Sequence, residues 1–260
     1  MITCELMGGL GNQLFQIFTV ISYSIKHNVP FTFNYSETLK IGRERPTYWN
    51  NLLRSVKLYT DTDVNIKCWY NEPSFRFSEI PKAENCSLCG YFQSYKYFEE
   101  NKKTIIGLCE LDQQRTPIRK AISIHFRIGD FKQLQEYHPI LGIGYYENAM
   151  RYLEDKIGND YTVMVFCERE DQDVVRKMIA CLNIKYPITF VDDSIPDWEQ
   201  MLMMSSCEIN IIANSTFSWW GAYLNDSPDR IVLYPSTWFG HNLRHDISDL
   251  FPPDWRKIDS

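Results

Sequence analysis

The sequence predicts an α/β protein with two halves, the second built around a parallel sheet, and three observations support this. After residue 120, short apolar runs alternate regularly with amphipathic segments of helical length. Such alternation requires crossover helices and therefore parallel strands. The first strand-like run, residues 1–7, likewise leads through a glycine-rich turn into an amphipathic segment. A polar stretch that ends in proline, residues 111–117, separates the two regions.

The first half contains one clear helix and a long stretch without a clear pattern. Apolar side chains recur at spacings of four, three and four from Leu14 to Ile25, which predicts a helix after the glycine-rich turn. Residues 30–115 are rich in aromatic side chains and interrupted by prolines, and their pattern fits either α/β or irregular structure. We therefore expect one domain over residues 1–115 and a second over residues 116–260.

The second half predicts five strands and four helices. The expected strands are residues 121–126, 161–167, 188–191, 208–213 and 230–234, and the expected helices are residues 145–157, 171–182, 197–205 and 215–224. Open parallel sheets bind ligands beyond the carboxyl ends of their strands, where loops lead into helices. Three unusual loops occupy such places, namely residues 8–13, 125–130 and 214–220. We expect the functional residues to lie in these loops.

Composition limits the class of ligand. The 260 residues are 44% hydrophobic and 23% charged, which is typical of a globular protein. The net charge is -6 and the sequence shows no basic stripe, which argues against a nucleic-acid partner. An anionic ligand would therefore be bound by a few local donors. The sequence shows neither a leader peptide nor an apolar run of the ~18 residues that a membrane span needs, so we expect a cytoplasmic protein without a transmembrane segment.

The eight cysteines are scattered, and several lie in apolar runs. In a chain of this size, that pattern favours reduced, buried thiols over a disulfide framework. Cys86 and Cys89 form a single CxxC pair without a second pair or a nearby histidine. A zinc or redox role for this pair is an alternative, but a structural role is favoured.

The first loop, Gly8-Gly9-Leu10-Gly11-Asn12-Gln13, joins a strand to a helix. Glycines permit a tight turn and close approach of a ligand, and free amides at a helix start attract anions. The loop matches neither GxGxxG nor a P-loop. The candidate binding residues here are Gly9, Gly11, Asn12 and Gln13. The two amide side chains suit sugar hydroxyls, or they brace the loop, and a plain turn is the alternative for the glycines.

The second loop, residues 125–130, follows a predicted strand directly. Strand alternation places His125 and Arg127 on one side of the strand, opposite the apolar side. The planar guanidinium of Arg127 suits a phosphate group. Asp130 could accept a proton or hold Arg127 in position. The alternative is an Arg–Asp ion pair that only braces the loop.

The third loop begins a helix with an unusual number of polar groups. Asn214 or Ser215 can cap the helix, and Thr216 and Ser218 add hydroxyls to its first turn. The positive end of the helix dipole suits a pyrophosphate. An ordinary capped core helix is the alternative. The face expected to be buried contains Phe217, Trp220 and Leu224.

In this order, the three loops resemble the motifs of glycosyltransferase family 11, the α-1,2-fucosyltransferases. The family pattern is GGLGNQ, HxRRGD and NSTFSWWxAxL. The corresponding segments here are GGLGNQ (8–13), HFRIGD (125–130) and NSTFSWWGAYL (214–224). Weaker matches such as HPILGIGYYENAM (138–150) extend the resemblance over nearly the whole chain.

The resemblance implies a GT-B-like fold in which two Rossmann-like α/β domains face each other across a cleft. It implies that residues 1–115 form the acceptor side and that residues 116–260 bind the nucleotide sugar. The implied reaction transfers L-fucose from GDP-fucose to the 2-hydroxyl of a galactose-type glycan, with inversion and without a metal ion or other cofactor. The expected partners are the sugar-nucleotide donor and the acceptor glycan, and the oligomeric state is not indicated.

The resemblance also implies roles for individual residues. Arg127 would bind the donor pyrophosphate, assisted by His125 and by the helix start at residues 214–218. The base candidates do not come from the resemblance. Carboxylates are the usual proton acceptors in glycosyl chemistry, so Asp130 is the first candidate and Glu136 the second; His138 is a third candidate, for which a structural role is favoured. The second arginine of the family motif is replaced by Ile128, which cannot donate a hydrogen bond. The alternatives are therefore a donor such as GDP-rhamnose or an inactive module that binds sugar nucleotides.

Overall fold

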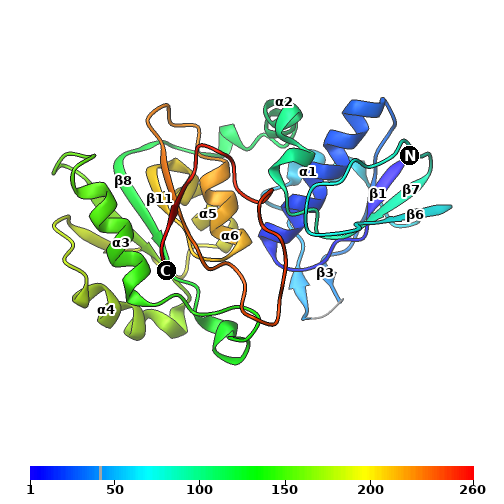
Figure 1. The fold of residues 1–260 in the computed structure, drawn as a ribbon. Helices are drawn as coiled ribbons and strands as arrows, with labels where there is room; N and C mark the ends of the chain where they lie inside the picture. The colour runs from blue at the N-terminus through cyan, green and yellow to red at the C-terminus, as the bar shows by residue number, and fades with distance from the viewer. Residues whose placement is uncertain (41–42) are drawn as a thin grey trace. The chain divides into compact units, whose positions relative to one another are not determined.

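The computed structural model describes residues 1–40 and 43–260, which form two compact units (Figure 1). The first unit comprises Met1–Gln114 and His245–Pro252, and the second comprises Arg115–Arg244 and Pro253–Ser260. Both units are α/β structures with parallel sheets, as the sequence predicts. That the units form an acceptor side and a donor side across a cleft stays a prediction. In the described ranges, no helix has both the length and the apolar character needed to span a membrane.

One segment differs from the predicted domains, because residues 245–252 pack with the first unit rather than with the second. The carboxylate of Asp249 accepts hydrogen bonds from the Lys96 ammonium and from the Phe77 amide, the latter at 3.2 Å. The Ser94 hydroxyl donates to the Asp249 carbonyl at 2.7 Å, and Leu250 is fully buried. These partners lie far from residue 249 in the chain, so no local pattern in the sequence reports the contact.

The first unit consists of one long helix, several short elements and a small parallel sheet. Its strands are β1 (Ile2–Cys4), β2 (Phe33–Asn34), β3 (Thr38–Leu39), β4 (Arg45–Pro46), β5 (Thr60–Asp61), β6 (Cys68–Asn71) and β7 (Cys86–Cys89), and its helices are α1 (Leu10–His27) and α2 (Lys102–Leu108). Short 3-10 helices are Arg54–Tyr59, Tyr95–Tyr97, Glu99–Asn101 and Asp112–Gln114. The three-stranded sheet has the parallel order β1-β7-β6, whereas β2 pairs with β5 and β3 with β4. Of the two predicted alternatives for residues 30–115, α/β or irregular, the structure shows the first, in the form of short elements.

Local chemistry fixes both ends of α1. Gly8 adopts φ +80 just before the helix, a conformation that other residues rarely adopt. Asn28 ends the helix in the left-handed conformation, and its amide donates to the carbonyl of Ile25. The helix is buried along most of its length, because Leu14, Phe18 and their neighbours have no exposed surface.

The second unit is built on a six-stranded parallel sheet. Its strands are β8 (Ile118–His125), β9 (Thr162–Phe166), β10 (Ile188–Phe190), β11 (Cys207–Ile211), β12 (Ile231–Pro235) and β13 (Arg256–Ile258), and its helices are α3 (Ile143–Glu154), α4 (Gln172–Cys181), α5 (Asp197–Ser206) and α6 (Thr216–Tyr223). Short 3-10 helices are Gly129–Gln133 and Arg169–Asp171. The spatial order is β10-β9-β8-β11-β12-β13, in which the direction of winding reverses between β8 and β11. This is the 3-2-1-4-5-6 order of doubly wound nucleotide-binding sheets.

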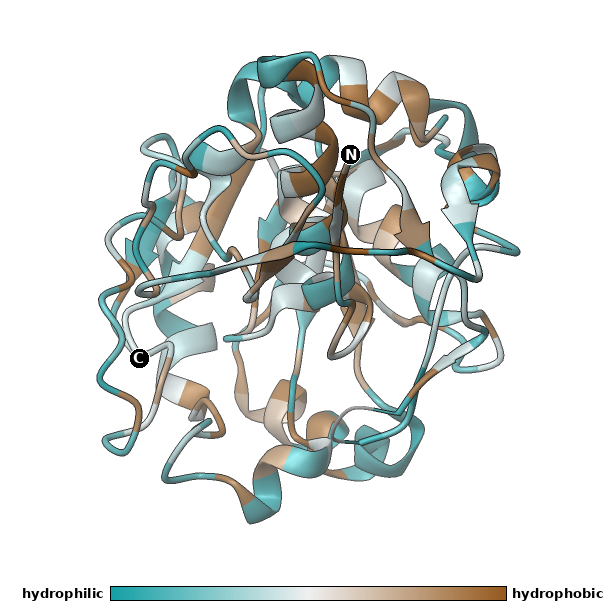
Figure 2. Cartoon of the chain, turned by 90° about the vertical axis from the view of Figure 1, so that its right-hand side faces the viewer, coloured by the Kyte–Doolittle hydropathy of each residue, from teal (hydrophilic) through white to brown (hydrophobic). Residues whose placement is uncertain are grey.

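Helices cover both faces of this sheet (Figure 1). Helices α3 and α4 pack on the face that carries Ile122 and Ile124, in one large apolar cluster. Residues of α5 and α6 pack on the opposite face, where Met204 contacts Phe166. Hydrophobic residues gather in the strands and in parts of the helices, whereas the connecting segments are largely hydrophilic (Figure 2). The prediction of alternating strands and helices is therefore confirmed.

Two details of the predicted second half are wrong. The predicted strand 230–234 is present as β12 but does not close the sheet, because β13 follows it, and a three-residue strand with Ile258 as its only buried side chain produces no apolar run. Helix α6 is also buried on more sides than expected. Trp219 and Trp220 are both fully buried, and the Trp219 ring stacks on Tyr223 with centroids 4.6 Å apart.

The cysteines form no disulfide in the described part of the chain. Cys4, Cys86, Cys109 and Cys207 are buried, as expected, whereas Cys181 is exposed. Cys86 and Cys89 both lie on strand β7, and burial raises the pKa of the Cys86 thiol to about 12. The thiol of Cys86 is therefore protonated at neutral pH and poorly suited to nucleophilic chemistry.

Candidate functional site

Two of the three predicted loops leave neighbouring strands at the same edge of the second unit's sheet. Strand β8 runs parallel to β11, with Ile124 opposite Ile211 in the register. Residues 125–130 therefore continue from one strand and residues 212–220 from the other. The chain turns toward opposite faces of the sheet after these two strands, and in doubly wound folds ligands bind at this reversal. The centroids of the His125 and Phe217 rings, which belong to the two loops, are 5.5 Å apart.

Arg127 is held between two carboxylates at this edge. Its guanidinium donates to Asp130 at 2.5 Å and also to Glu168, which follows β9. The guanidinium carbon lies 5.3 Å from the centre of the Phe131 ring. The Arg127 side chain keeps 20% of its surface exposed, so it is oriented by its neighbours and still reaches solvent. The predicted ion pair of Arg127 with Asp130 is present, and Asp130 therefore holds Arg127 in position.

The loop after β9 contributes carboxylates that the sequence did not assign to the site. Asp171 is almost completely buried and accepts hydrogen bonds from the Gly129 amide at 2.6 Å and from the Lys132 ammonium at 2.5 Å. Together with the Arg127–Glu168 contact, these bonds fix residues 127–132 against residues 168–171. The available signal was the acidic run from Glu168 to Asp171 directly after a predicted strand.

Three of these carboxylates also form an acidic group. One oxygen of each of Glu168, Glu170 and Asp171 lies within 4.8 Å of the others, which is close enough to share a cation. Glu168 and Asp171 already bind the Arg127 and Lys132 cations. The absence of a metal requirement stays a prediction.

His125 is buried as a neutral imidazole. Its side chain is almost inaccessible, and its Nδ1 has no hydrogen-bond partner among the described residues. Burial, and to a smaller extent the nearby Arg127 charge, lowers the pKa of His125 to about 3. The backbone at His125 is held by helix α3, because the Tyr146 hydroxyl donates to the His125 carbonyl at 3.1 Å. A buried polar atom without a partner is unusual, and this one lies two residues from Arg127.

The polar groups at the start of α6 are used mainly inside the protein. Ser215 caps the helix by accepting from the Phe217 amide at 3.3 Å. Asn214 donates to the carbonyls of Pro139 and Trp238, while the buried Ser218 hydroxyl donates to Ala213 at 3.4 Å. The alternative of a capped core helix therefore accounts for Asn214, Ser215 and Ser218. The Oδ1 atom of Asn214 is the one side-chain oxygen of these three that has no partner in the described chain.

The first predicted loop, residues 8–13, lies in the first unit. Gln13 is fully buried and its amide donates to the carbonyls of Gly8 at 3.0 Å and Pro46 at 2.9 Å. Asn12 accepts from the Gln93 amide at 3.0 Å. The loop-bracing alternative for these two amides is therefore present. Gly9 caps α1 and Gly11 is buried in its first turn, so a donor-binding role for either glycine stays a prediction.

The second and third base candidates make other contacts. Glu136 is exposed, and its carboxylate accepts from the Asn242 amide at 2.9 Å. The His138 ring stacks on Phe131, with centroids 5.0 Å apart, which is the structural role that the sequence favoured. Asp130 is thus the base candidate that contacts Arg127.

Comparison with known proteins agrees with these motifs. The model of the family described as Glycosyl transferase family 11 matches residues 1–259. An O-antigen biosynthesis glycosyltransferase (WbnK) of Escherichia coli is 32% identical over 68% of this chain and 65% of its own length. An α-1,2-colitosyltransferase of Escherichia coli is 24% identical over 99% of both chains. A galactoside 2-α-L-fucosyltransferase of Caenorhabditis elegans is 22% identical over 99% of this chain and 79% of its own.

Among solved structures, the Escherichia coli ADP-heptose lipopolysaccharide heptosyltransferase II resembles 62% of this chain and 43% of its own length. The TM-score is 0.37 and the sequence identity is 16%, which is too low to support an inference.

Ile128 stands where the family motif has a second arginine, and a substitution there tests whether this position is structural or can bind the donor. The side chain is buried with Ile124 and Phe126, as strand alternation predicts. Ile128→Arg should lower the free energy of unfolding by roughly 3 kcal/mol, because it buries a charge without a partner. Urea unfolding measures this, with Ile143→Arg at an exposed position of α3 as the control. An unchanged stability together with a lower donor KM would instead show that an arginine is accommodated and binds the nucleotide.

The buried His125 predicts a pH-dependent stability. The native chain keeps His125 neutral down to about pH 3, whereas the unfolded chain binds a proton at the ordinary pKa of 6.5. In this window the unfolded state binds more protons, so the free energy of unfolding falls as pH falls, by about 1.4 kcal/mol per pH unit. In urea unfolding, the free energy of unfolding of His125→Gln should therefore fall less between pH 6.5 and pH 5.0 than that of the wild type. The exposed His241→Gln variant should retain the wild-type pH dependence, and equal pH dependence in all three proteins would contradict the assignment.

Proposed function

The chain belongs to glycosyltransferase family 11, and from this premise we propose that it transfers L-fucose from GDP-fucose to the 2-hydroxyl of a galactose-type acceptor glycan. The proposed reaction inverts the sugar carbon and needs no metal ion. One observation carries the proposal for this chain. The loops with Arg127 and the start of α6 leave the two strands between which the winding of the sheet reverses.

The arrangement suits stabilisation of a departing diphosphate. Arg127 supplies a pre-oriented cation, and the start of α6 supplies the positive end of a helix dipole. Glu168 is the more exposed of the two Arg127 partners, with 42% of its side-chain surface accessible against 26% for Asp130. We infer that the diphosphate replaces Glu168, while Asp130 keeps Arg127 in its orientation. The unpartnered Nδ1 of the neutral His125 is a further contact for the donor.

Proton transfer from the acceptor needs a carboxylate near the reacting sugar. We assign this role first to Asp130, which lies beside Arg127 and is partly exposed, so that one carboxylate would both orient Arg127 and accept the proton. Glu136 is the second candidate; its carboxylate is exposed and binds the neutral Asn242 amide rather than a cation.

A second donor is favoured by one observation. The relative that matches 99% of this chain and 99% of its own length is named for the transfer of colitose, not fucose. Both are deoxyhexoses, so a related GDP-deoxyhexose such as GDP-colitose or GDP-rhamnose is the alternative donor.

The proposal is tested by incubating the purified chain with each GDP-sugar and with lactose, in buffer that contains EDTA. Mass spectrometry and NMR of the product report the sugar, its linkage and its anomeric configuration. We expect an α-1,2-linked fucosyl product that forms at the same rate with and without EDTA. Transfer of another sugar would support the second donor, and GDP-sugar binding without any product would indicate an inactive module. Activity that EDTA abolishes and manganese restores would contradict the metal-free reaction.

Arg127→Ala should lower kcat/KM by about a hundredfold or more, because it removes a charge-assisted contact to the leaving group. The matched control is Arg151→Ala, in which the deleted arginine pairs with Glu147 on the surface of α3. Both variants should show the wild-type circular dichroism spectrum. Wild-type turnover by Arg127→Ala would exclude this arginine from the donor site.

A further inference from the structure

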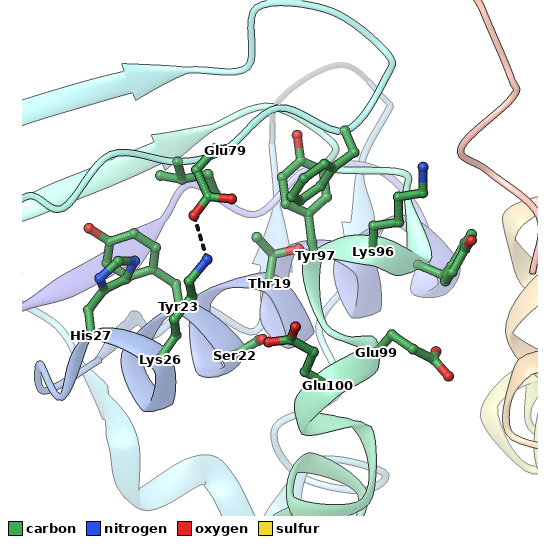
Figure 3. Close-up of a pocket in the computed structure, with 13 residues that line it drawn as sticks. Thr19, Ser22, Tyr23, Lys26, His27, Glu79, Lys96, Tyr97, Glu99 and Glu100 are labelled. Atoms are coloured by element: carbon green, nitrogen blue, oxygen red, sulfur yellow. Dashed lines mark hydrogen bonds and ion pairs between the residues drawn. The ribbon is translucent and has the colours of Figure 1, made fainter.

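The first unit contains a cavity of 440 Å³ that the proposed reaction does not use (Figure 3). Its walls are the second half of α1, residues 77–80 and residues 95–100. The cavity begins at Thr19, nine residues after the start of α1, and therefore about 14 Å along the helix axis from the glycine-rich loop. Its volume lies in the range of small-molecule binding sites.

Two hydroxyls on α1 line the inner part of the cavity. Thr19 is only 1% exposed, and its Oγ1 has no hydrogen-bond partner among residues 1–40 and 43–260. Ser22 is also buried, and its Oγ accepts from the Asn101 amide at 3.0 Å, which leaves its own hydrogen available. A buried hydroxyl without a partner is unfavourable, and a ligand hydroxyl that reached Oγ1 from the cavity would satisfy it.

The aromatic wall of the cavity is held rigidly. The Tyr23 hydroxyl accepts from the Ala83 amide at 2.7 Å, and the Tyr97 hydroxyl accepts from the Ser78 amide at 3.1 Å. The rings of Phe77 and Tyr97 are in contact, with centroids 4.9 Å apart. Rigid rings offer an apolar surface against which the C–H groups of a ligand can pack at little entropic cost.

The charged residues of the lining do not favour an anionic ligand. Lys26 is paired with Glu79, and Lys96 is paired with Asp249 (Figure 3 shows the first pair). Glu99 and Glu100, both exposed, add two further carboxylates to the lining. These carboxylates do not converge on a cation site, because among the described residues the single group of three close ligands is the one at Glu168. The lining thus contains carboxylate acceptors for hydroxyl groups and suits a neutral polyhydroxyl ligand.

We propose that this cavity binds a neutral sugar residue of the acceptor glycan, other than the residue that receives the transferred sugar. Carboxylates and hydroxyls bind its hydroxyl groups, and the rings of Phe77 and Tyr97 pack on its apolar side. The identity of the ligand as an acceptor rests on the proposed function, whereas the presence of a carbohydrate site does not. The cavity would make the enzyme select longer acceptors over the terminal sugar alone.

Binding is measured on the intact chain without donor, using lacto-N-tetraose and methyl β-galactoside as probes. Saturation-transfer NMR identifies the sugar residues in contact with the protein, and titration gives the affinities. Thr19→Val replaces the unpartnered hydroxyl with a methyl group of similar size. We expect this variant to lose about tenfold in its preference for the tetrasaccharide over the monosaccharide, without a lower melting temperature.

Thr3→Val is the matched control, because Thr3 in β1 also has a buried, unpartnered Oγ1 but does not line the cavity. It should bind both probes as the wild type does. Equal binding of the tetrasaccharide by the two variants, or contacts confined to its terminal galactose, would overturn the proposed site. The readout does not require turnover. A chain that transfers no fucose but loses tetrasaccharide binding in Thr19→Val would therefore contradict the proposed function and support the cavity as a carbohydrate site.

Discussion

The buried side chain of Asn210 joins the two strands on which the candidate site depends. From β11 its amide donates to the Ser123 hydroxyl of β8 at 2.8 Å and to the Met204 carbonyl of α5 at 2.7 Å. Its own oxygen accepts from Asn225, just beyond α6, at 2.8 Å. A polar group at this depth is tolerated because every one of its bonds is made, and a fully satisfied network of this kind fixes a single register. The register of β8 against β11 therefore sets the positions of the loops that follow these two strands.

Electrostatics at the site is local rather than global. The chain carries a net charge of -6, so no long-range field attracts an anionic donor. Asp130 and Glu168 keep Arg127 oriented, and Asp171 holds the Gly129 amide and Lys132 beside it. In the free protein, these ion pairs partly neutralise the positive charge of Arg127. The donor then meets a cation whose position is already fixed, which is the condition for efficient stabilisation of developing charge.

Helix α1 connects two features of the first unit. Its start closes the glycine-rich loop, where Gln13 ties that loop to Pro46. Its second half carries Thr19 and Ser22 into the cavity. Because a helix is rigid over this length, the loop and the cavity keep a constant separation. If both bind parts of one glycan, this separation sets the length of acceptor that satisfies both.

The sequence by itself determined the α/β class, the alternation of strands and helices after residue 120, and the side of β8 on which Ile128 is buried. These features follow from the spacing of apolar side chains over a few consecutive residues, which the sequence shows directly. The sequence also located the loops that carry Arg127 and Ser215, because glycines, caps and strand ends leave local signatures. It did not show that Glu168 and Asp171 hold the Arg127 loop, that Ser215 and Ser218 serve the helix itself, or that Asp249 packs with Lys96. Each of these contacts joins groups whose partner is selected by strand order and packing, and in a chain with many carboxylates and hydroxyls only the tertiary structure decides which of them meet.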